Sequence, residues 1–337
     1  MRRMIRSASL TGYAEVAANA GLDAGGMLAE FHLPAAALHE AEVKLSGDAV
    51  RRILEACARR SRIECFGLLM AEKRRLAHLG PLGLFMREQP TMHHAMRALV
   101  RYANRVNQAV FVTIEDGDEV VALRAEVIVG GSGTIRQAAE LTLGVVFLAL
   151  REVLPEFEPL RVCLAHAPPA NHDVHRRIFG DRVEFRQDLN AIVCSRRDLA
   201  IANPGADPVM ARYAREMVES SFRARPLMTD HVRELVLAQL AAGPCSIEVA
   251  AKQIGVSRRT LHRQLAREGH TFSQILDDMR RELAARYVAD KHRSLAEVSE
   301  LLGFAAPSGF SRWYRRQFNS SASAAGARAR TKKKEKA

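Results

Sequence analysis

Short amphipathic helices alternate with sharp turns in the last third of the chain. Residues 246–254 repeat small and apolar side chains at helical spacing after a serine that can cap the helix, and Gly255 then permits a tight turn. The helix that follows Ser257 carries Leu261 and Leu265 four residues apart on its inner face. This spacing predicts a helix-turn-helix unit whose second helix exposes its opposite face.

The same pattern returns near the C-terminus, in residues 294–318. A serine again opens the first helix, Gly303 stands at the turn, and three aromatic residues recur every four positions in the second helix: Phe310, Tyr314 and Phe318. Residues 273–289 lie between the two units and predict a linker helix of about 26 Å, at about 1.5 Å per residue. The repeat predicts an all-α C-terminal domain with two helix-turn-helix units joined by this linker helix.

Two more helices are expected before this repeat. Residues 207–222 predict a helix with one apolar face, made of Met210, Tyr213, Met217 and Val218. The next helix, residues 230–242, ends at Gly243–Pro244, because proline cannot continue a helix.

The first two hundred residues mix helical and strand patterns, which predicts an α+β domain. Helical spacing occurs at 48–60, 66–75, 92–102, 134–153 and 173–178, and strand-like segments at 109–116, 119–129, 161–167, 182–185 and 190–195. The first two strands flank Asp116, Gly117 and Asp118, which predicts a hairpin.

The composition fits an ordinary globular protein, with 337 residues of which 48% are hydrophobic and 26% charged. The longest strongly apolar run, Leu141–Leu150, falls well short of the roughly 20 residues that cross a bilayer, and the basic N-terminus lacks the apolar core of a signal peptide. We therefore expect a cytoplasmic protein without a membrane span. Five cysteines without a CxxC pair predict free, mostly buried thiols.

The positive charge is concentrated near the C-terminus. The net charge is +12, from 50 Lys and Arg and 38 Asp and Glu, and residues 241–337 hold 19 of the basic but only 9 of the acidic residues. A basic segment gains affinity for a polyanion such as DNA, because its binding releases counterions from the phosphates of the polyanion. A basic surface that serves only solubility would show the same excess of positive charge. The last residues, 328–337, predict a basic, disordered tail that binds nonspecifically.

Basic and polar side chains occupy the predicted outer faces of both second helices. Arginine can bridge O6 and N7 of guanine, whereas the first helix of such a unit crosses the phosphate backbone. An ordinary basic helical hairpin would carry similar residues. The outward residues are Arg258, Arg259, His262, Arg263 and Arg267 in the first unit, and Ser308, Ser311, Arg312, Arg315 and Arg316 in the second.

Three stretches within roughly residues 230–320 resemble the DNA-binding domain of the AraC/XylS family of bacterial transcription regulators: VAAKQIGVSRRTLHRQLAREG, FSQILDDMRRELAARYVAD and SLAEVSELLGFAAPSGFSRWYRRQF. The resemblance implies DNA contacts by Arg258, Arg259, His262 and Arg263 in the first unit and by Pro307, Ser308, Ser311 and Arg312 in the second, to which the outer-face pattern adds Arg315. Two features depart from the family. NSSASAAGAR follows Phe318 in place of the usual turn, which puts the final helix in doubt, and Trp313 replaces a residue that is commonly small.

Most of residues 10–200 resemble the N-terminal effector domain, called arabinose-binding, of the branch of that family typified by ornithine-utilisation regulators. The matching stretches are FGLLMAEKRRLAHLGPLGLFMREQPTMHHAMRALVRY, IRQAAELTLGVV and RVCLAHAPPANHDVHRRIFGDRVEFRQDLNAIV. We therefore expect four segments: an effector-sensing and dimerisation domain in residues 1–205, a helical connector and linker in 206–228, the double helix-turn-helix domain in 229–327 and the tail in 328–337.

Histidines are the candidate metal ligands of the N-terminal region. His93 and His94 are adjacent, and His166, His172 and His175 fall in one stretch. Histidine clusters can bind zinc, but the adjacent pair would point in different directions on a helix, and no HExxH motif is present. Residues 130–133 are glycine-rich without a phosphate-binding motif, which favours a flexible connection. We expect no metal, no cofactor and no catalytic residue.

The sequence therefore predicts a one-component transcription regulator. Its expected partners are double-stranded promoter DNA, an unidentified small-molecule effector, RNA polymerase and a second copy of the chain in a homodimer. Two alternatives remain open from the sequence: a ligand-independent nucleic-acid-binding or architectural protein, and a metabolic enzyme with an appended DNA-binding module.

Overall fold

The computed structural model describes residues 3–129, 133–221, 227–242, 245–289 and 293–326. Contacts divide the chain into two compact units, residues 1–223 without 131–133, and residues 224–337 together with 131–133. Several predicted features lie outside the described residues: segment 130–132, linker residues 222–226, Gly243–Pro244 and the tail 328–337. No helix among the described residues is long and apolar enough to cross a membrane.

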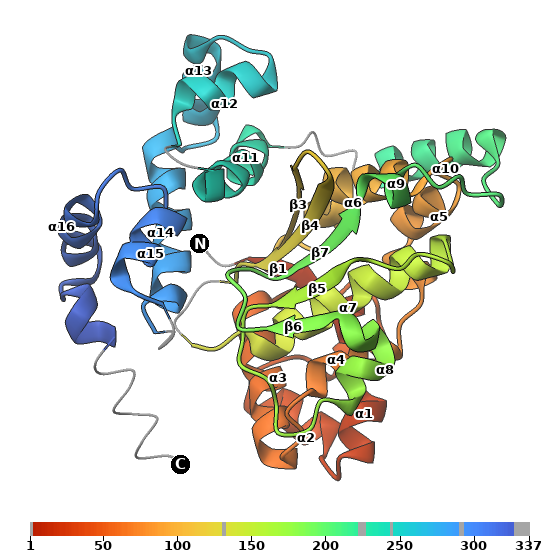
Figure 1. The fold of residues 1–337 in the computed structure, drawn as a ribbon. Helices are drawn as coiled ribbons and strands as arrows, with labels where there is room; N and C mark the ends of the chain where they lie inside the picture. The colour runs from red at the N-terminus through yellow and green to blue at the C-terminus, as the bar shows by residue number, and fades with distance from the viewer. Residues whose placement is uncertain (1–2, 130–132, 222–226, 243–244, 290–292, 327–337) are drawn as a thin grey trace. The chain divides into compact units, whose positions relative to one another are not determined.

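The N-terminal unit is an α+β domain, as predicted (Figure 1). Its α-helices are α1 (Tyr13–Asn19), α2 (Ala24–Glu30), α3 (Gly47–Ser61), α4 (Phe66–Glu72), α5 (Pro81–Arg87), α6 (Met92–Val106), α7 (Arg136–Val153), α8 (Asp173–Phe179), α9 (Arg196–Leu199) and α10 (Pro208–Ser221). Short 3-10 helices span Ser7–Leu10, Ala35–Leu38, Leu76–Leu79 and Gly180–Arg182. The strands are β1 (Met4–Arg6), β2 (Lys44–Ser46), β3 (Val110–Asp116), β4 (Val120–Val127), β5 (Arg161–Leu164), β6 (Val183–Phe185) and β7 (Ala191–Ser195).

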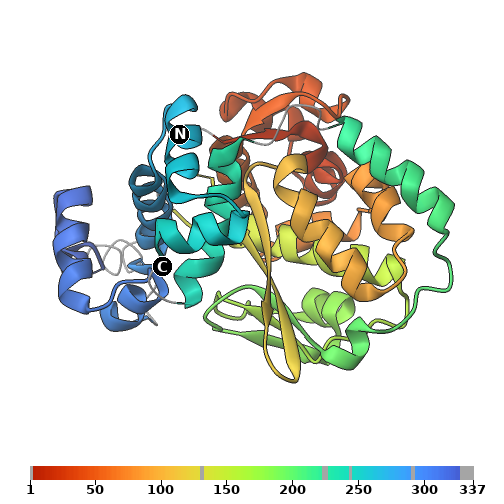
Figure 2. The same cartoon turned by 90° about the horizontal axis from the view of Figure 1, so that it is seen from above.

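Five of these strands form one sheet in the order β3-β4-β7-β5-β6. β3 and β4 are the predicted antiparallel hairpin, with Val110 opposite Val127, and Figure 2 shows them as a long twisted pair. β7 pairs antiparallel with both β4 and β5, and β6 joins the edge parallel to β5. β1 and β2 form a separate two-stranded sheet.

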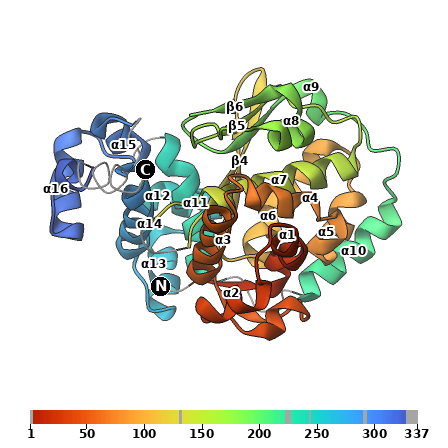
Figure 3. The ribbon, with the colours of Figure 1, turned by 90° about the horizontal axis from the view of Figure 1, so that it is seen from below.

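Helix α7 is the centre of this unit. It packs against the sheet and against α3, α4, α5, α6 and α8 (Figure 3). Leu143 and Leu150 on α7 are fully buried. A glycine lets α4 approach α7 closely, because a Cβ atom at Gly67 would lie 2.0 Å from the carbonyl oxygen of Gln137. The unit also buries four of the five cysteines as free thiols, as predicted: Cys57, Cys65, Cys163 and Cys194.

The exposure of α10 corrects one prediction. The helix forms where expected and packs against α5, but the residues it buries are Ala214 and Val218. Met210, Tyr213 and Met217 were expected on the buried face and are 38%, 50% and 48% exposed. The prediction was wrong at these three positions because α10 contacts its neighbour through its smaller side chains.

The C-terminal unit is all-α, as predicted. Its helices are α11 (Met228–Ala242), α12 (Ile247–Ile254), α13 (Arg258–Arg267), α14 (Phe272–Tyr287), α15 (Leu295–Leu301) and α16 (Pro307–Phe318). Figures 1 and 3 show the pair α12–α13 and the pair α15–α16 toward opposite ends of α14. α11 packs against α12, α13, α14 and α15 and buries Val232, Val236 and Leu240.

Side-chain caps fix where these helices begin. Ser246, Ser257 and Ser294 each accept a hydrogen bond from the amide three residues further on. α14 begins one residue earlier than predicted, because Thr271 caps it. The sequence left in doubt whether a helix follows Phe318. Residues 322–326 are helical, and the hydroxyl of Ser321 accepts a hydrogen bond from the amide of Ala324 at 3.2 Å.

Candidate DNA-binding surface and effector cavity

Buried leucines hold α13 in the first helix-turn-helix unit. Gly255 adopts the left-handed conformation at the turn, with φ 78°, and the next amide, of Val256, donates to the carbonyl of Ala251 at 3.0 Å. Leu261 and Leu265 are fully buried among the neighbouring helices. The opposite face of α13 is therefore left to solvent.

The four predicted DNA-contacting residues of this unit lie on that exposed face: Arg258, Arg259, His262 and Arg263. Arg258 differs from the others because its guanidinium pairs with Glu248 of α12 at 2.9 Å, with both side chains more than half exposed. Within the described residues, no acidic side chain forms an ion pair with Arg259 or Arg263. The guanidinium groups of these two residues can therefore reach a phosphate or a base edge without first breaking an ion pair.

Aromatic side chains hold α16 in the second unit. Phe310 is fully buried, and Tyr314 contacts it with ring centroids 5.6 Å apart. Trp313, which departs from the family pattern, packs 5.4 Å from the ring of Phe304, and its Nε1 donates to a carboxylate oxygen of Asp277 at 2.7 Å. The exposed face carries every residue predicted for this unit: Pro307, Ser308, Ser311, Arg312 and Arg315.

Two polar residues of α14 position the second unit and were missed by the sequence analysis. Asp277 accepts from Trp313, as described. Arg280 donates from Nε to the carbonyl of Leu302 and from a terminal nitrogen to the carbonyl of Gly303, both at 2.9 Å, and its guanidinium lies 4.1 Å from the ring centre of Phe304. Both residues lie beside the apolar stripe of the linker helix. Only this position in the sequence could have indicated that they contact the second unit.

A carboxylate joins α13 to α11 in the first unit. Glu268 accepts hydrogen bonds from the amides of Met228 and Thr229 at 2.7 and 2.8 Å, at the positive N-terminal end of α11. Burial raises the pKa of Glu268, but the hydrogen bonds from Thr229 and Met228 lower it more, so that this pKa lies below its ordinary value. The charged carboxylate therefore stabilises this junction.

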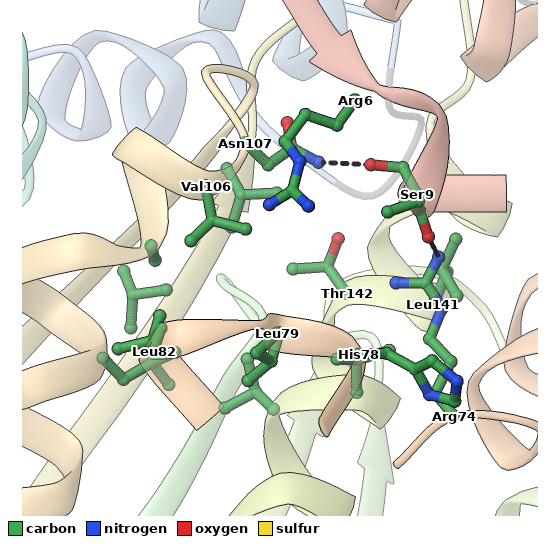
Figure 4. Close-up of a pocket in the computed structure, with 17 residues that line it drawn as sticks. Arg6, Ser9, Arg74, His78, Leu79, Leu82, Val106, Asn107, Leu141 and Thr142 are labelled. Atoms are coloured by element: carbon green, nitrogen blue, oxygen red, sulfur yellow. Dashed lines mark hydrogen bonds between the residues drawn. The ribbon is translucent and has the colours of Figure 1, made fainter. Parts of the chain in front are cut away.

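The N-terminal unit contains a mainly apolar cavity between α5, α6, β3 and α7 (Figure 4). Its empty space, counted with the open solvent at its mouth, is about 740 Å³, of which about 90 Å³ can hold the centre of a water-sized molecule, and apolar side chains such as Leu82, Leu99 and Val145 form most of its wall. The polar lining comes from a few residues, Arg6, Ser9, Arg74, His78, Asn107 and Thr142. Asn107 donates a side-chain hydrogen bond to the hydroxyl of Ser9 at 3.2 Å. An apolar wall with a few polar groups is typical of a small-molecule site.

The two arginines of the cavity differ in their partners. Arg6 pairs with the carboxylate of Glu42. Arg74 donates to the carbonyl of Ala8 at 2.9 Å, its Nε is buried without a hydrogen-bond partner, and no acidic side chain among the described residues forms an ion pair with it. Burial lowers the pKa of Arg74 to about 10, so it stays charged at neutral pH. The sequence carried no signal for this site, since Arg74 lies in a loop between helices.

Comparison with known proteins agrees with both units. Residues 21–203, more than half of the chain, match the arabinose-binding N-terminal domain of AraC transcription regulators, and residues 250–328 match a helix-turn-helix domain. The HTH-type transcriptional regulator VirS of Mycobacterium tuberculosis is 28% identical over 321 residues, which cover 94% of each chain. The Ornithine utilization regulator of Pseudomonas aeruginosa is 28% identical over 255 residues, which cover 74% of this chain and 75% of that one. The crystal structure of the transcriptional regulator CdpR from Pseudomonas aeruginosa is 20% identical, with a TM-score of 0.43, and the match covers 88% of this chain and 94% of that one.

The two domain matches and the two regulators of similar sequence agree with the sequence resemblance in both halves of the chain. An effector domain and a helix-turn-helix domain on one chain make a DNA-binding regulator under ligand control, and not an enzyme. The chain belongs to the AraC family of transcription regulators, in the branch whose N-terminal domain is of the arabinose-binding type.

Proposed function

We propose that α13 and α16 enter successive major-groove segments on one side of a promoter duplex, with α14 setting their separation. The 16 residues of α14 span about 24 Å, and a helix is about 10 Å wide, so two helices held at its opposite ends would have axes roughly 24 to 34 Å apart. The upper end of this range reaches the roughly 34 Å that separates successive major grooves on one face of DNA. The observation that carries the proposal is the pair of exposed basic faces, each opposite a buried face: α13 packs on α11 and α12, and α16 is bonded to α14 through Trp313 and Asp277.

Within this arrangement, Arg259 and Arg312 are proposed to read bases, most readily guanine, through bidentate hydrogen bonds. His262, Arg263 and Arg315 lie on the same faces and are proposed to add base or phosphate contacts, which orient the helices. Arg258 is proposed to act near the phosphates, because Glu248 already neutralises part of its charge. In the second unit, Pro307 begins α16, and Ser308 and Ser311 offer short hydroxyl donors to the backbone or to base edges.

The test of these roles begins with footprinting to find the operator, followed by binding titrations of the full chain. Arg259→Ala and Arg312→Ala should each weaken binding to the operator by about 1 to 3 kcal/mol, or roughly 5- to 150-fold, and leave binding to unrelated DNA much less changed. Arg197→Ala removes an exposed arginine of the N-terminal unit and serves as the charge-matched control. Unchanged operator affinity in both variants would rule out the base-reading assignment, and a footprint without a preferred site would favour an architectural protein.

We further propose that the effector is a small organic acid with an apolar body, bound in the cavity with its anionic group on Arg74. A partly buried guanidinium without a counter-charge gains stability from an anionic partner. Screening carboxylic acids against their amides by thermal shift should identify acids that raise the unfolding temperature of the full chain. Arg74→Met should abolish the shift and Arg161→Met, a change at an exposed arginine, should not; amides that shift the unfolding temperature as strongly as acids would contradict the assignment.

The assembly state and the contact with the transcription machinery are also proposals. We propose that the chain acts as a homodimer, so that two copies bind adjacent half-sites, and that the DNA-bound form contacts RNA polymerase. The family membership supports both. Light scattering of the purified chain, with and without operator DNA, measures the first, and transcription in a purified system with polymerase measures the second.

A further inference from the structure

Two of the histidines seen in the sequence meet a buried carboxylate inside the N-terminal unit. Glu140 on α7 and His175 on α8 are fully buried, and His166, just after β5, is 15% exposed. The Nε2 atoms of His166 and His175 lie 3.0 and 3.2 Å from the same carboxylate oxygen of Glu140. Phe185 covers the group, with its ring centre 5.6 Å from that of His166 and 5.2 Å from that of His175.

The hydrogen bonding of His166 leaves a lone pair directed at this carboxylate. Its Nδ1 lies 2.9 Å from the carbonyl oxygen of Ala167, which can only accept, so Nδ1 carries the proton. In the neutral ring, Nε2 is then an acceptor, and it lies beside another acceptor, the carboxylate oxygen of Glu140. Nε2 of His166, Nδ1 of His175 and the second oxygen of Glu140 are all buried without a hydrogen-bond partner. A cation between the two Nε2 atoms and the carboxylate would satisfy Nε2 of His166 and the carboxylate, whereas Nδ1 of His175 lies on the other side of its ring.

We propose that Glu140, His166 and His175 bind a divalent transition-metal ion of the Zn²⁺ type. Two imidazole nitrogens and a carboxylate oxygen form a ligand set that Zn²⁺ takes in proteins, and they leave one position for water. In a tetrahedron with bonds of about 2.0 to 2.1 Å, neighbouring ligand atoms are about 3.3 Å apart, close to the two distances between imidazole nitrogen and carboxylate oxygen given above. The carbonyl of Ala167 accepts from Nδ1 of His166, and metal-binding histidines usually have such a partner on the ring nitrogen that does not bind the metal.

The charge around the carboxylate is compatible with such an ion. Arg136 donates at 3.1 Å to Oε1, the carboxylate oxygen that both imidazoles approach, and leaves Oε2 free of hydrogen bonds. The sequence alone predicted no metal site because Glu140 comes from a different helix. The structure also leaves His93, His94 and His172 outside this group.

The experiment uses the full chain, freed of metal with a chelator and titrated with Zn²⁺ alone against a chromophoric competitor. The wild type should bind one Zn²⁺ per chain, and Co²⁺ should give the visible absorption of a low-coordinate site. His166→Gln and His175→Gln should each weaken Zn²⁺ binding at least about 10-fold, since even loss of a supporting contact costs 10- to 100-fold. His172→Gln is the matched control: its ring lies 6.3 Å from that of Phe185, and it lies outside the triad, so this variant should bind as the wild type does.

Three results would overturn the proposal. The first is a wild type without saturable Zn²⁺ binding, which would mean that a proton on His166 fills the role of the cation. The second is equal binding by wild type, His166→Gln and His175→Gln, and the third is equal loss in His172→Gln. If the fully buried His175 does not tolerate substitution, His166→Gln and the Co²⁺ spectrum decide the question.

Discussion

Arg280 fastens the second helix-turn-helix unit to the linker helix, and its replacement gives a quantitative test of the structure. Arg280→Met keeps much of the length of the side chain and removes every donor. The carbonyls of Leu302 and Gly303 then lose their shared partner, and Phe304 loses the guanidinium above its ring. We expect the C-terminal unit to lose stability while its helices still form, because the apolar contacts of α14 remain.

The size of the loss follows from these contacts. A hydrogen bond from a charged donor contributes about 1.5 to 3 kcal/mol, and a cation over an aromatic ring about 0.5 to 2 kcal/mol. Arg280 is only partly buried, so the lower ends of these ranges apply. Two such hydrogen bonds and one cation–ring contact give about 3.5 kcal/mol at these lower ends, so the free energy of unfolding should fall by about 3 to 4 kcal/mol. Arg280→Lys keeps the charge and can reach one carbonyl, and it should lose about half as much.

The chain offers a local probe for this measurement, since Trp313 is its single tryptophan. Its ring lies against Phe304, so its fluorescence reports on the second unit during urea unfolding of the full chain. With a slope of about 2 kcal/mol per molar urea, the midpoint should fall by about 1.5 to 2 M. Arg281→Met is the control: Arg281 is exposed and bonded to Gln317, and surface contacts contribute less than about 1 kcal/mol. A midpoint shift no larger in Arg280→Met than in the control would refute the reasoning.

Three further predictions concern a cap, a charge and a glycine. Ser257→Ala removes the cap of α13 and should cost about 1 kcal/mol, seen as faster hydrogen exchange in the first turn of that helix. The folded-state pKa of Glu268 is depressed, so the stability that this carboxylate contributes is present above the ordinary glutamate pKa and is lost as the pH falls through the lower folded value. Urea midpoints measured at decreasing pH should show this loss. The Glu268→Gln variant should have a midpoint that depends less on pH. Gly67→Ala brings a Cβ to 2.0 Å from a backbone carbonyl of α7 and should cost about 3 kcal/mol, whereas Gly25→Ala, which meets only an ordinary contact of 3.6 Å, should be tolerated in the same thermal melt.

The sequence predicts the C-terminal unit well because the signals there are local. Helical spacing, a capping serine and a glycine at each turn determine both helix pairs, and the outward residues follow from the buried ones. The N-terminal unit is less predictable. Helices α1, α2 and α5 are single short elements of seven residues, whose pattern does not distinguish them from loops. In α10 the periodicity was detected, but the sequence does not show which side chains contact α5, which is far away in the sequence, and Met210 and Tyr213 are exposed.

The residues that the sequence could not assign are charged groups with distant partners. Arg74, Glu140 and Arg280 would each be placed at the surface by composition and spacing. The structure gives Arg280 its partners 22 and 23 residues away, and Glu140 a hydrogen-bonded histidine 35 residues away. Since burial of a charge is costly unless it is compensated, such groups mark places where tertiary contacts or a ligand provide the compensation.

Helix α7 brings the two proposed ligand sites of the N-terminal unit together. Glu140 belongs to the histidine group, while the next two residues, Leu141 and Thr142, line the cavity. An ion that joins α7 to α8 and an acid that binds against α7 would therefore act on the same rigid element. Because binding free energies are reciprocal, any factor by which the ion changes the affinity for the acid must equal the factor by which the acid changes the affinity for the ion. The packing of α7 against five helices and the sheet gives both ligands a common route to the rest of the unit, whereas two sites on separate surface loops would have none.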